Sequence, residues 1–310
     1  MIKRTLYFGN PAYIGKTNDQ LIVRLPQVEK NASLPESFKK EAVATIPIED
    51  IGVVVIDHQQ VTITQGLMAA LIENNTAVIV CNETHHPTGL MLPLDMHNIQ
   101  HERFKVQIEA TVPLKKQLWQ QTVEAKIGNQ AVMLKKAGYD PGRLLVMART
   151  VKSGDPENVE GAAAHYYWST LFSNHIAFSR SRNGDPPNNL LNYGYAILRA
   201  VTARSLVGSG LLPTLGIHHS NKYNAYCLAD DIMEPYRPFV DEIVFNMVSE
   251  KSEMSELTVE LKKKLLAICT VDIYFEGELS PLMVGMQRTT ASLAQCFEGE
   301  RRRITYPELK

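Results

Sequence analysis

Few cysteines and no long apolar run exclude several classes of protein. Cys81, Cys227, Cys269 and Cys296 are scattered through 310 residues without a CxxC pair, so neither a disulfide framework nor a cysteine zinc site is indicated. No apolar run approaches the length needed to cross a bilayer, and Met1 leads into IKRTLYFGN without the apolar core of a secretory signal. These absences favour a folded protein of a reducing, cytoplasmic compartment with no membrane partner.

The chain also lacks a strong net charge. It has 32 Lys and Arg against 33 Asp and Glu, which gives a formal charge of −1. Nucleic-acid binding depends on local basic clusters rather than on the total, and such clusters also occur on ordinary solvated surfaces. The candidates for DNA contacts are basic residues placed around the helices that carry the sequence motifs described below. They are Arg180, Arg182, Arg199, Arg204 and Lys222.

What is present is a change of periodicity along the chain. As far as about residue 82, short runs such as TLYFG, QLIVRL and IGVVVID are rich in β-branched and aromatic residues, with one helix expected after Thr64 and a loop at 26–41. After His101 the spacing is helical almost to the end. We therefore predict an α+β protein with a β-rich domain at 1–86 and a larger all-α domain at 87–310, joined by a linker at 87–100.

Turn residues predict several helix boundaries. Gly138 is a natural helix end, and Asp155-Pro156 predicts the start of the helix that contains ENVEGAAAHYYW. Pro186-Pro187 begins another helix, which ends at glycines, and later helices are expected at about 240–248, 257–268 and 281–297.

The stretch GIHHSNKYNAYCLADDIMEPYRP, residues 216–238, concentrates groups that bind metal ions. It contains His218, His219, Asp230, Asp231 and Glu234. The pair at 231 and 234 is three residues apart, so both carboxylates project from one face of a helix. Clustered carboxylates disfavour one another's ionisation unless a cation compensates, and a divalent metal is one such cation.

The helix of this stretch is expected to begin after Ser220 or Asn221, both good N-cap residues. Pro235 cannot donate a hydrogen bond to the carbonyl of Asp231, so it should distort the helix beside the carboxylates. A solvated acidic face with a capping histidine would explain the same residues without a metal.

Two other metal sites are alternatives. His85, His86, His97 and His101 invite a zinc interpretation, but no HExxH motif is present. A non-haem iron centre of His218, His219 and Asp231 fails on geometry, because adjacent histidines rarely both face one ion.

Five sequence motifs, taken together, are specific to one family. They are NPAYI, TIPIEDIGVVVID, HPTGLMLPLDMH, VEGAAAHYYW and LPTLGIHHSNKYNAYCLADDIMEPYRPFVD. Over nearly its whole length the chain resembles the CRISPR-associated spacer-acquisition integrases, most closely those of type II systems.

The resemblance implies metal ligands at Glu160, His219 and Glu234. An aspartate occupies the last position in many members, and both acids bind divalent ions. Asp231 matches a second acidic position and is expected to support the site, whereas the resemblance assigns no role to His218 or Asp230. Two carboxylates and an imidazole suit Mn²⁺ better than Mg²⁺, and either ion is expected to serve.

The resemblance also implies a function and partners. The N-terminal domain would form a homodimer, which assembles with a small ferredoxin-like subunit into a heterohexamer-type complex, with the RNA-guided effector nuclease as a further candidate partner. The complex would insert double-stranded protospacer DNA into the CRISPR repeat by metal-dependent transesterification. The alternative is a non-catalytic architectural DNA-binding subunit of the same complex.

Overall fold

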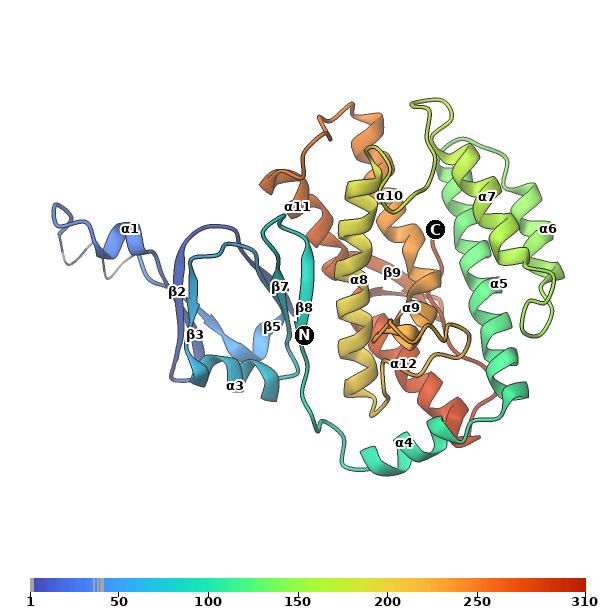
Figure 1. Ribbon diagram of the computed structural model, residues 1–310, viewed down its shortest axis with the longest axis horizontal. Helices are drawn as coiled ribbons and strands as arrows, with labels where there is room; N and C mark the ends of the chain where they lie inside the picture. The colour runs from blue at the N-terminus through green and yellow to red at the C-terminus, as the bar shows by residue number, and fades with distance from the viewer. Residues whose placement is uncertain (1–2, 36, 38, 40–41) are drawn as a thin grey trace. The chain divides into compact units, whose positions relative to one another are not determined.

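The computed structural model describes residues 3–35, 37, 39 and 42–310, which form two compact units (Figure 1). The units are Met1–Met96 and His97–Lys310. This division falls later than the predicted boundary at residue 86. The segment that was expected to begin the linker instead forms strand β8 (Pro87–Met91), which belongs to a sheet of the first unit.

The N-terminal unit contains two four-stranded sheets, as the alternating apolar runs predicted. One sheet has the order β1 (Arg4–Phe8), β5 (Ile51–Ile56), β7 (Ala77–Cys81), β8, in which only β8 is antiparallel to its neighbour. The other has the order β4 (Ala44–Pro47), β3 (Gln20–Arg24), β2 (Ala12–Thr17), β6 (Val61–Ile63).

Helix α3 (Gln65–Glu73) packs into the apolar core of the same unit through Leu67 and Leu71. The Thr64 hydroxyl accepts a hydrogen bond from the Leu67 amide, which confirms the predicted cap. The expected loop at 26–41 contains the short helix α1 (Pro26–Glu29), and its residues 36, 38, 40 and 41 lie outside the described part.

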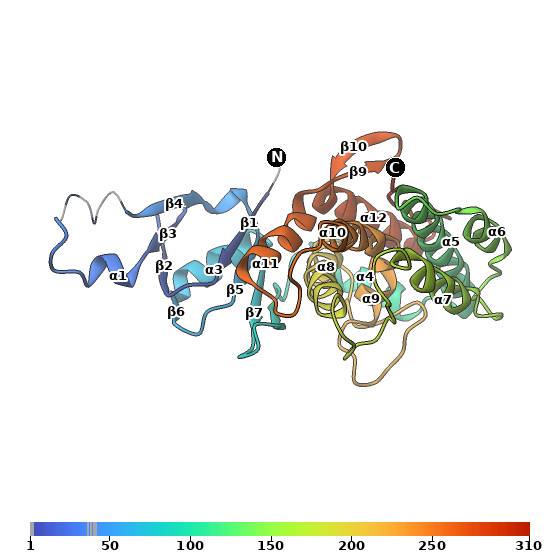
Figure 2. The same cartoon turned by 90° about the horizontal axis from the view of Figure 1, so that it is seen from above.

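The C-terminal unit is built around helices but is not all-α. Antiparallel strands β9 (Asp272–Phe275) and β10 (Glu278–Pro281) form a hairpin, which Figure 2 shows beside α12 and the C-terminus. The α+β class is confirmed, and the hairpin corrects the all-α description of this domain. The helices are α4 (Gln100–Ile108), α5 (Val112–Lys136), α6 (Gly142–Thr150), α7 (Val159–Leu171), α8 (Asn188–Gly208), α9 (Cys227–Met233), α10 (Arg237–Ser249), α11 (Val259–Leu266) and α12 (Leu282–Glu298).

Local turns shift two helix starts from their predicted positions. Helix α7 begins at Val159 rather than at Pro156, although the Asp155 carboxylate still accepts the amide protons of Val159 and Glu160. Helix α9 begins at Cys227 rather than after residue 221, because the side chains of Asn221 and Asn224 accept hydrogen bonds from amides two residues later and close separate turns.

The predicted distortion at Pro235 is present. Helix α9 ends at Met233, and residues Glu234–Tyr236 form the 3₁₀ turn η2 before α10 begins. Gly138 has φ +86° after α5, which confirms the predicted helix end. Among the described residues, no helix is long and apolar enough to cross a membrane.

Candidate functional site

A buried lysine joins the two carboxylates that were predicted as ligands. Nζ of Lys126, on α5, lies 2.6 Å from Oε2 of Glu234 and also donates a hydrogen bond to Oε1 of Glu160. Glu234 stands at the start of η2 and Glu160 in the first turn of α7. Three elements that are distant in sequence therefore bring two acids and one base to a single point.

A second cation holds the other oxygen of Glu234. The Arg237 guanidinium lies 2.9 Å from Glu234 Oε1, one turn along the chain. Burial alone would raise the pKa of Glu234, but the charges of Arg237 and Lys126 hold it below its ordinary value. Burial would likewise lower the pKa of Lys126, but Glu234 and Glu160 raise it. Glu234 and Lys126 are thus both charged at neutral pH.

Asp231 organises the turn that carries the histidines. It is fully buried, and its carboxylate accepts hydrogen bonds from the backbone amides of Ile217 at 2.7 Å, His218 at 2.9 Å and His219 at 3.2 Å. Gly216 is required beside it, because a Cβ there would lie 2.3 Å from the His219 carbonyl oxygen. The buried end of α9 therefore fixes the turn.

The same carboxylate orients the His219 ring. Oδ1 of Asp231 accepts the hydrogen bond from His219 Nδ1, and this bond raises the pKa of His219 although burial opposes it. With Nδ1 held, Nε2 is the ring nitrogen presented for a ligand, as in metal sites where a carboxylate orients a histidine. The charge of Glu234 also raises the pKa of His219.

His218 has a packing role instead. Its ring stacks on Trp119 with centroids 4.1 Å apart and planes within 1° of parallel. Burial lowers the pKa of His218, and the neighbouring His219 lowers it further. The two adjacent rings are nearly perpendicular, at 85°, so they face different surroundings.

One oxygen of Glu234 is available to a cation. Glu234 Oε2 is buried and forms an ion pair with Lys126 Nζ. This contact lacks hydrogen-bond geometry, so Oε2 has no hydrogen-bond partner in the described part of the chain. Across the described residues, no three His, Cys, Asp or Glu side chains are grouped tightly enough to hold a metal. Lys126 thus joins two of the three predicted ligands, Glu160 and Glu234, and a metal site made of these two acids and His219 stays a prediction.

The predicted DNA contacts divide into exposed and unavailable groups. Arg182 and Lys222 are exposed, whereas Arg180 is bound to Asn188 and Asn192. Arg204 is only 5% exposed, so its assignment as a direct DNA contact is wrong. Arg199 is half-buried and forms an ion pair with Asp230, at 2.6 Å and 3.1 Å, which also gives Asp230 a structural partner.

Two of the histidines considered for zinc, His85 and His97, contact other side chains within their own units. The His85 ring contacts Asp57 at 3.0 Å in the N-terminal unit, whereas His97 lies 2.9 Å from Arg103 in the C-terminal unit. His85 and His97 thus belong to different local networks.

Sequence reasoning missed Lys126, Trp119 and Asn129, all on α5. The sequence pattern that marks these residues is a helix face on which polar side chains interrupt buried apolar positions such as Val123 and Ile127. A lysine in such a position needs a buried partner.

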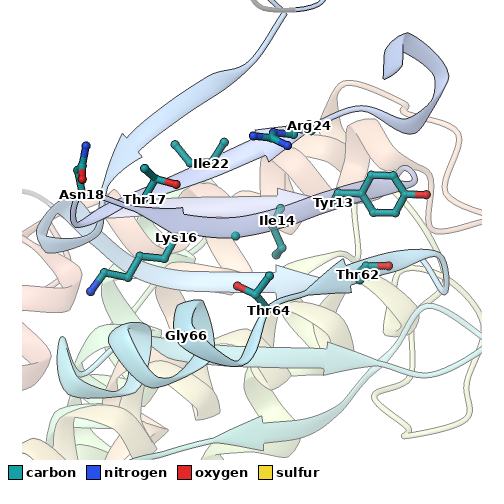
Figure 3. A pocket seen from close by; sticks show the side chains of 11 residues that line it. Tyr13, Ile14, Lys16, Thr17, Asn18, Ile22, Arg24, Thr62, Thr64 and Gly66 are labelled. Atoms are coloured by element: carbon teal, nitrogen blue, oxygen red, sulfur yellow. The ribbon is translucent and has the colours of Figure 1, made fainter. Parts of the chain in front are cut away.

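A cavity of about 590 Å³ lies in the N-terminal unit and shares no residue with this site (Figure 3). It is lined by β2, β3 and β6, with the basic residues Lys16 and Arg24 and the hydroxyls of Thr62 and Thr64 among its walls. Lys16 is paired with Asp19, and Arg24 with Glu29.

Known proteins resemble both the sequence and the fold. A relative named CRISPR-associated endonuclease Cas1, from Neisseria meningitidis serogroup C (strain 8013), is 35% identical over 86% of this chain and 87% of its own length. A casposase bound to its integration product matches with a TM-score of 0.80 and 20% identity, covering 100% of this chain and 95% of that one. A Cas6-RT-Cas1–Cas2 complex matches with a TM-score of 0.72 and 19% identity over 99% of this chain and 36% of that chain.

At such identities the two structures support the fold alone, whereas the sequence match decides the family. The model of the family described as CRISPR associated protein Cas1 matches residues 6–266, most of the chain. The chain therefore belongs to the CRISPR-associated Cas1 family.

Proposed function

We propose that this protein is a metal-dependent endonuclease and integrase that inserts DNA fragments into a CRISPR array. The observation that carries the proposal is the meeting of Glu160 and Glu234, from distant elements, at the buried ammonium of Lys126. The name of the Neisseria relative and the integration product of the casposase support the same class of reaction.

The reaction is a transesterification. The 3′-hydroxyl of the incoming strand attacks a phosphodiester of the repeat, and the 3′-oxygen of the cleaved strand leaves with the proton that the attacking hydroxyl gave up. One phosphodiester replaces another, so no high-energy cofactor is consumed.

Glu160, His219 and Glu234 would hold one Mg²⁺ or Mn²⁺ ion. When bound, the ion polarises the phosphoryl group and stabilises charge on the attacking and leaving oxygens. The chain's own contribution is position: Asp231 holds the Nδ1 proton of His219, and Arg237 fixes one oxygen of Glu234. His218 supports the turn by stacking on Trp119.

The proposed partners are double-stranded DNA, a second copy of the chain and a small ferredoxin-like subunit. The Cas1–Cas2 complex among the matching structures supports the small subunit. We infer a heterohexamer-type assembly with the N-terminal domains in the homodimer, and the RNA-guided effector nuclease as a further partner.

The alternative is an architectural DNA-binding subunit without catalysis. Buried carboxylates argue against it, because negative charges repel phosphates and contribute nothing to a purely electrostatic DNA surface. The presence of these carboxylates, one of which orients the His219 imidazole, favours the enzymatic function.

The test is Glu234→Gln, which keeps the shape of the side chain and removes its charge. Integration of a DNA fragment into a repeat-bearing plasmid should be abolished, while DNA binding stays near that of the wild type. His219→Ala should act alike, whereas His218→Ala should be milder because its ring faces Trp119. Glu278→Gln, on the exposed hairpin, is the matched control and should remain active.

Full integration by the Glu234→Gln protein would end the proposal. Integration that is unaffected by chelation of divalent ions would also contradict it. Loss of DNA binding in parallel with activity would favour the architectural alternative.

A further inference from the structure

Lys126 is a buried cation at the point where two acidic side chains meet. The residue is 7% exposed, and its Nζ contacts one oxygen of Glu160 and one of Glu234. Buried lysines are rare and need anionic partners, and here each partner is one of the acids expected to bind metal.

The ammonium compensates the repulsion between the two neighbouring acids. Like charges at contact distance destabilise each other, and burial strengthens this repulsion because water screens it less. One positive group between them offsets the repulsion. Because Nζ reaches an oxygen of each residue, a single ion placed near Nζ would reach the same two oxygens.

A divalent ion and the ammonium cannot share this place. Both are cations, and their mutual repulsion at ligand distances is large wherever water is excluded. Lysine differs from arginine in having a compact charged group on a flexible stem, so Nζ can withdraw without moving the helix.

We propose that the Lys126 ammonium occupies, in the metal-free protein, the place between Glu160 and Glu234 that a divalent ion takes in the loaded one. The inference rests on the proposed metal-dependent function and adds to it a competing internal cation. Lys126 is then a positioning residue: it keeps the carboxylates together for the metal and weakens the metal's affinity at the same time.

The first test measures metal binding directly. Lys126→Met keeps an unbranched side chain and removes the charge, and free Mn²⁺ is followed by its electron paramagnetic resonance signal during titration. The dissociation constant for Mn²⁺ should fall by about tenfold or more, because the ion no longer displaces a charged group. The metal-free variant should also melt at a lower temperature than the wild type, and Mn²⁺ should raise its melting temperature more.

Two further variants are controls for the Mn²⁺ affinity of Lys126→Met. Lys135→Met removes the same charge from an exposed position on the same helix and should bind Mn²⁺ as the wild type does. Lys126→Arg keeps the charge and should not bind more tightly than the wild type. If Lys126→Met folds only with Mn²⁺ present, that dependence is itself the expected stabilisation by the ion.

A crystal structure of the wild type with Mn²⁺ provides a second measurement. Nζ should have left its place between the two acids and the ion should touch both. An ion bound elsewhere with Nζ still between Glu160 and Glu234 would overturn the inference, as would unchanged or weaker Mn²⁺ binding by Lys126→Met.

The inference and the proposed function can fail separately. If Glu234→Gln binds Mn²⁺ as tightly as the wild type does, the assignment of the metal site is wrong. If that binding is lost in Glu234→Gln but equal in the wild type and Lys126→Met, the site stands and the competing role of the lysine falls.

Discussion

Asp241 is a fully buried carboxyl group that lies outside the candidate site. The hydroxyl of Tyr167 donates to its Oδ2 at 2.9 Å, and the hydroxyl of Tyr195 donates to its Oδ1. Burial raises its pKa to about 7, although these hydroxyls and the charges of Arg237 and Arg180 act in the opposite direction. The group therefore titrates near neutral pH in the folded protein and near its ordinary 3.8 when unfolded.

The first prediction follows from this difference. Between the two pKa values the folded protein holds a proton that the unfolded chain releases, so stability falls as pH rises toward 7. Between pH 5.5 and pH 8 the contribution of Asp241 to the free energy of unfolding should fall by about 2 kcal/mol. Urea unfolding of Asp241→Asn should lack this part of the pH slope. The exposed Asp272→Asn should keep it, and equal slopes for the wild type and Asp241→Asn would contradict the account.

The second prediction concerns Gly216. An added Cβ would lie 2.3 Å from the His219 carbonyl oxygen and 2.8 Å from Asp231 Oδ2, so the turn must shift. Gly216→Ala should lower the free energy of unfolding by about 1–3 kcal/mol and, by moving His219, slow strand transfer by about 100-fold. Gly128→Ala, where a Cβ would meet nothing within 4 Å, should be neutral or stabilising. Wild-type integration by Gly216→Ala would show that the turn does not position the imidazole.

At the residue scale, the sequence named the acids and the histidine as candidate ligands, which stays a prediction, but not the side chains that contact them. Spacing selected His219 and Glu234, and resemblance alone selected Glu160. Lys126 stands out in sequence only as a lysine among buried apolar positions, and its partners depend on the packing of α5 against α7 and η2, which no local pattern encodes. Arg204 was misassigned for the same reason, because its basic neighbourhood in sequence does not reveal that packing buries its side chain.

Among the elements, α5 carries most of the contacts that assemble the site. Besides Trp119 and Lys126 it provides Asn129, whose amide nitrogen donates to the Pro235 carbonyl at 2.7 Å and to the Pro307 carbonyl at 3.1 Å. The Asn129 carbonyl oxygen accepts the Leu309 amide proton at 3.0 Å. One side chain therefore joins α5, the turn that bears Glu234, and the C-terminal segment.

The third prediction tests this junction. Asn129→Ala leaves two carbonyl groups and one amide without their buried partner, which should cost about 2–4 kcal/mol of unfolding free energy. Thermal melting and urea unfolding measure the loss, and Mn²⁺ binding should weaken because η2 is released. Asn246→Ala, exposed on α10, is the control. A loss in Asn129→Ala no larger than in this control would contradict the assigned role.

Element boundaries were predicted well where one residue decides them and poorly where side chains compete with the helix. Gly138 and Thr64 decide their boundaries alone, by a left-handed conformation and a capping hydroxyl. The start of α9 was placed too early because Asn221 and Asn224 bind nearby backbone amides and delay the helix. Strand β8 was missed because its proline and glycine resemble a linker, whereas pairing with β7 decides its structure.

At the scale of the whole molecule, periodicity alone predicted the α+β class and the division into two units. The formal charge of −1 is the property that fits a DNA-binding protein least. The structure adds to the difficulty, because the candidates Arg180 and Arg199 are bound to protein partners, whereas Arg182 and Lys222 remain exposed. Of the predicted contacts, Arg182 and Lys222 are therefore the ones left for the proposed DNA binding.

The last prediction concerns those side chains. Phosphate contacts release counterions, so the logarithm of DNA affinity should fall linearly with the logarithm of salt concentration, with about one unit of slope for each contact. Arg182→Gln and Lys222→Gln each remove an exposed charge and should lower the slope by about one unit, equally for unrelated DNA sequences. Fluorescence anisotropy with a labelled duplex between 50 and 200 mM salt gives the slopes. Lys263→Gln, which removes an exposed charge from α11, should leave the slope unchanged. Wild-type affinity that is flat across this range would mean that DNA is not held through its phosphates, because no other term of the interaction has this salt dependence.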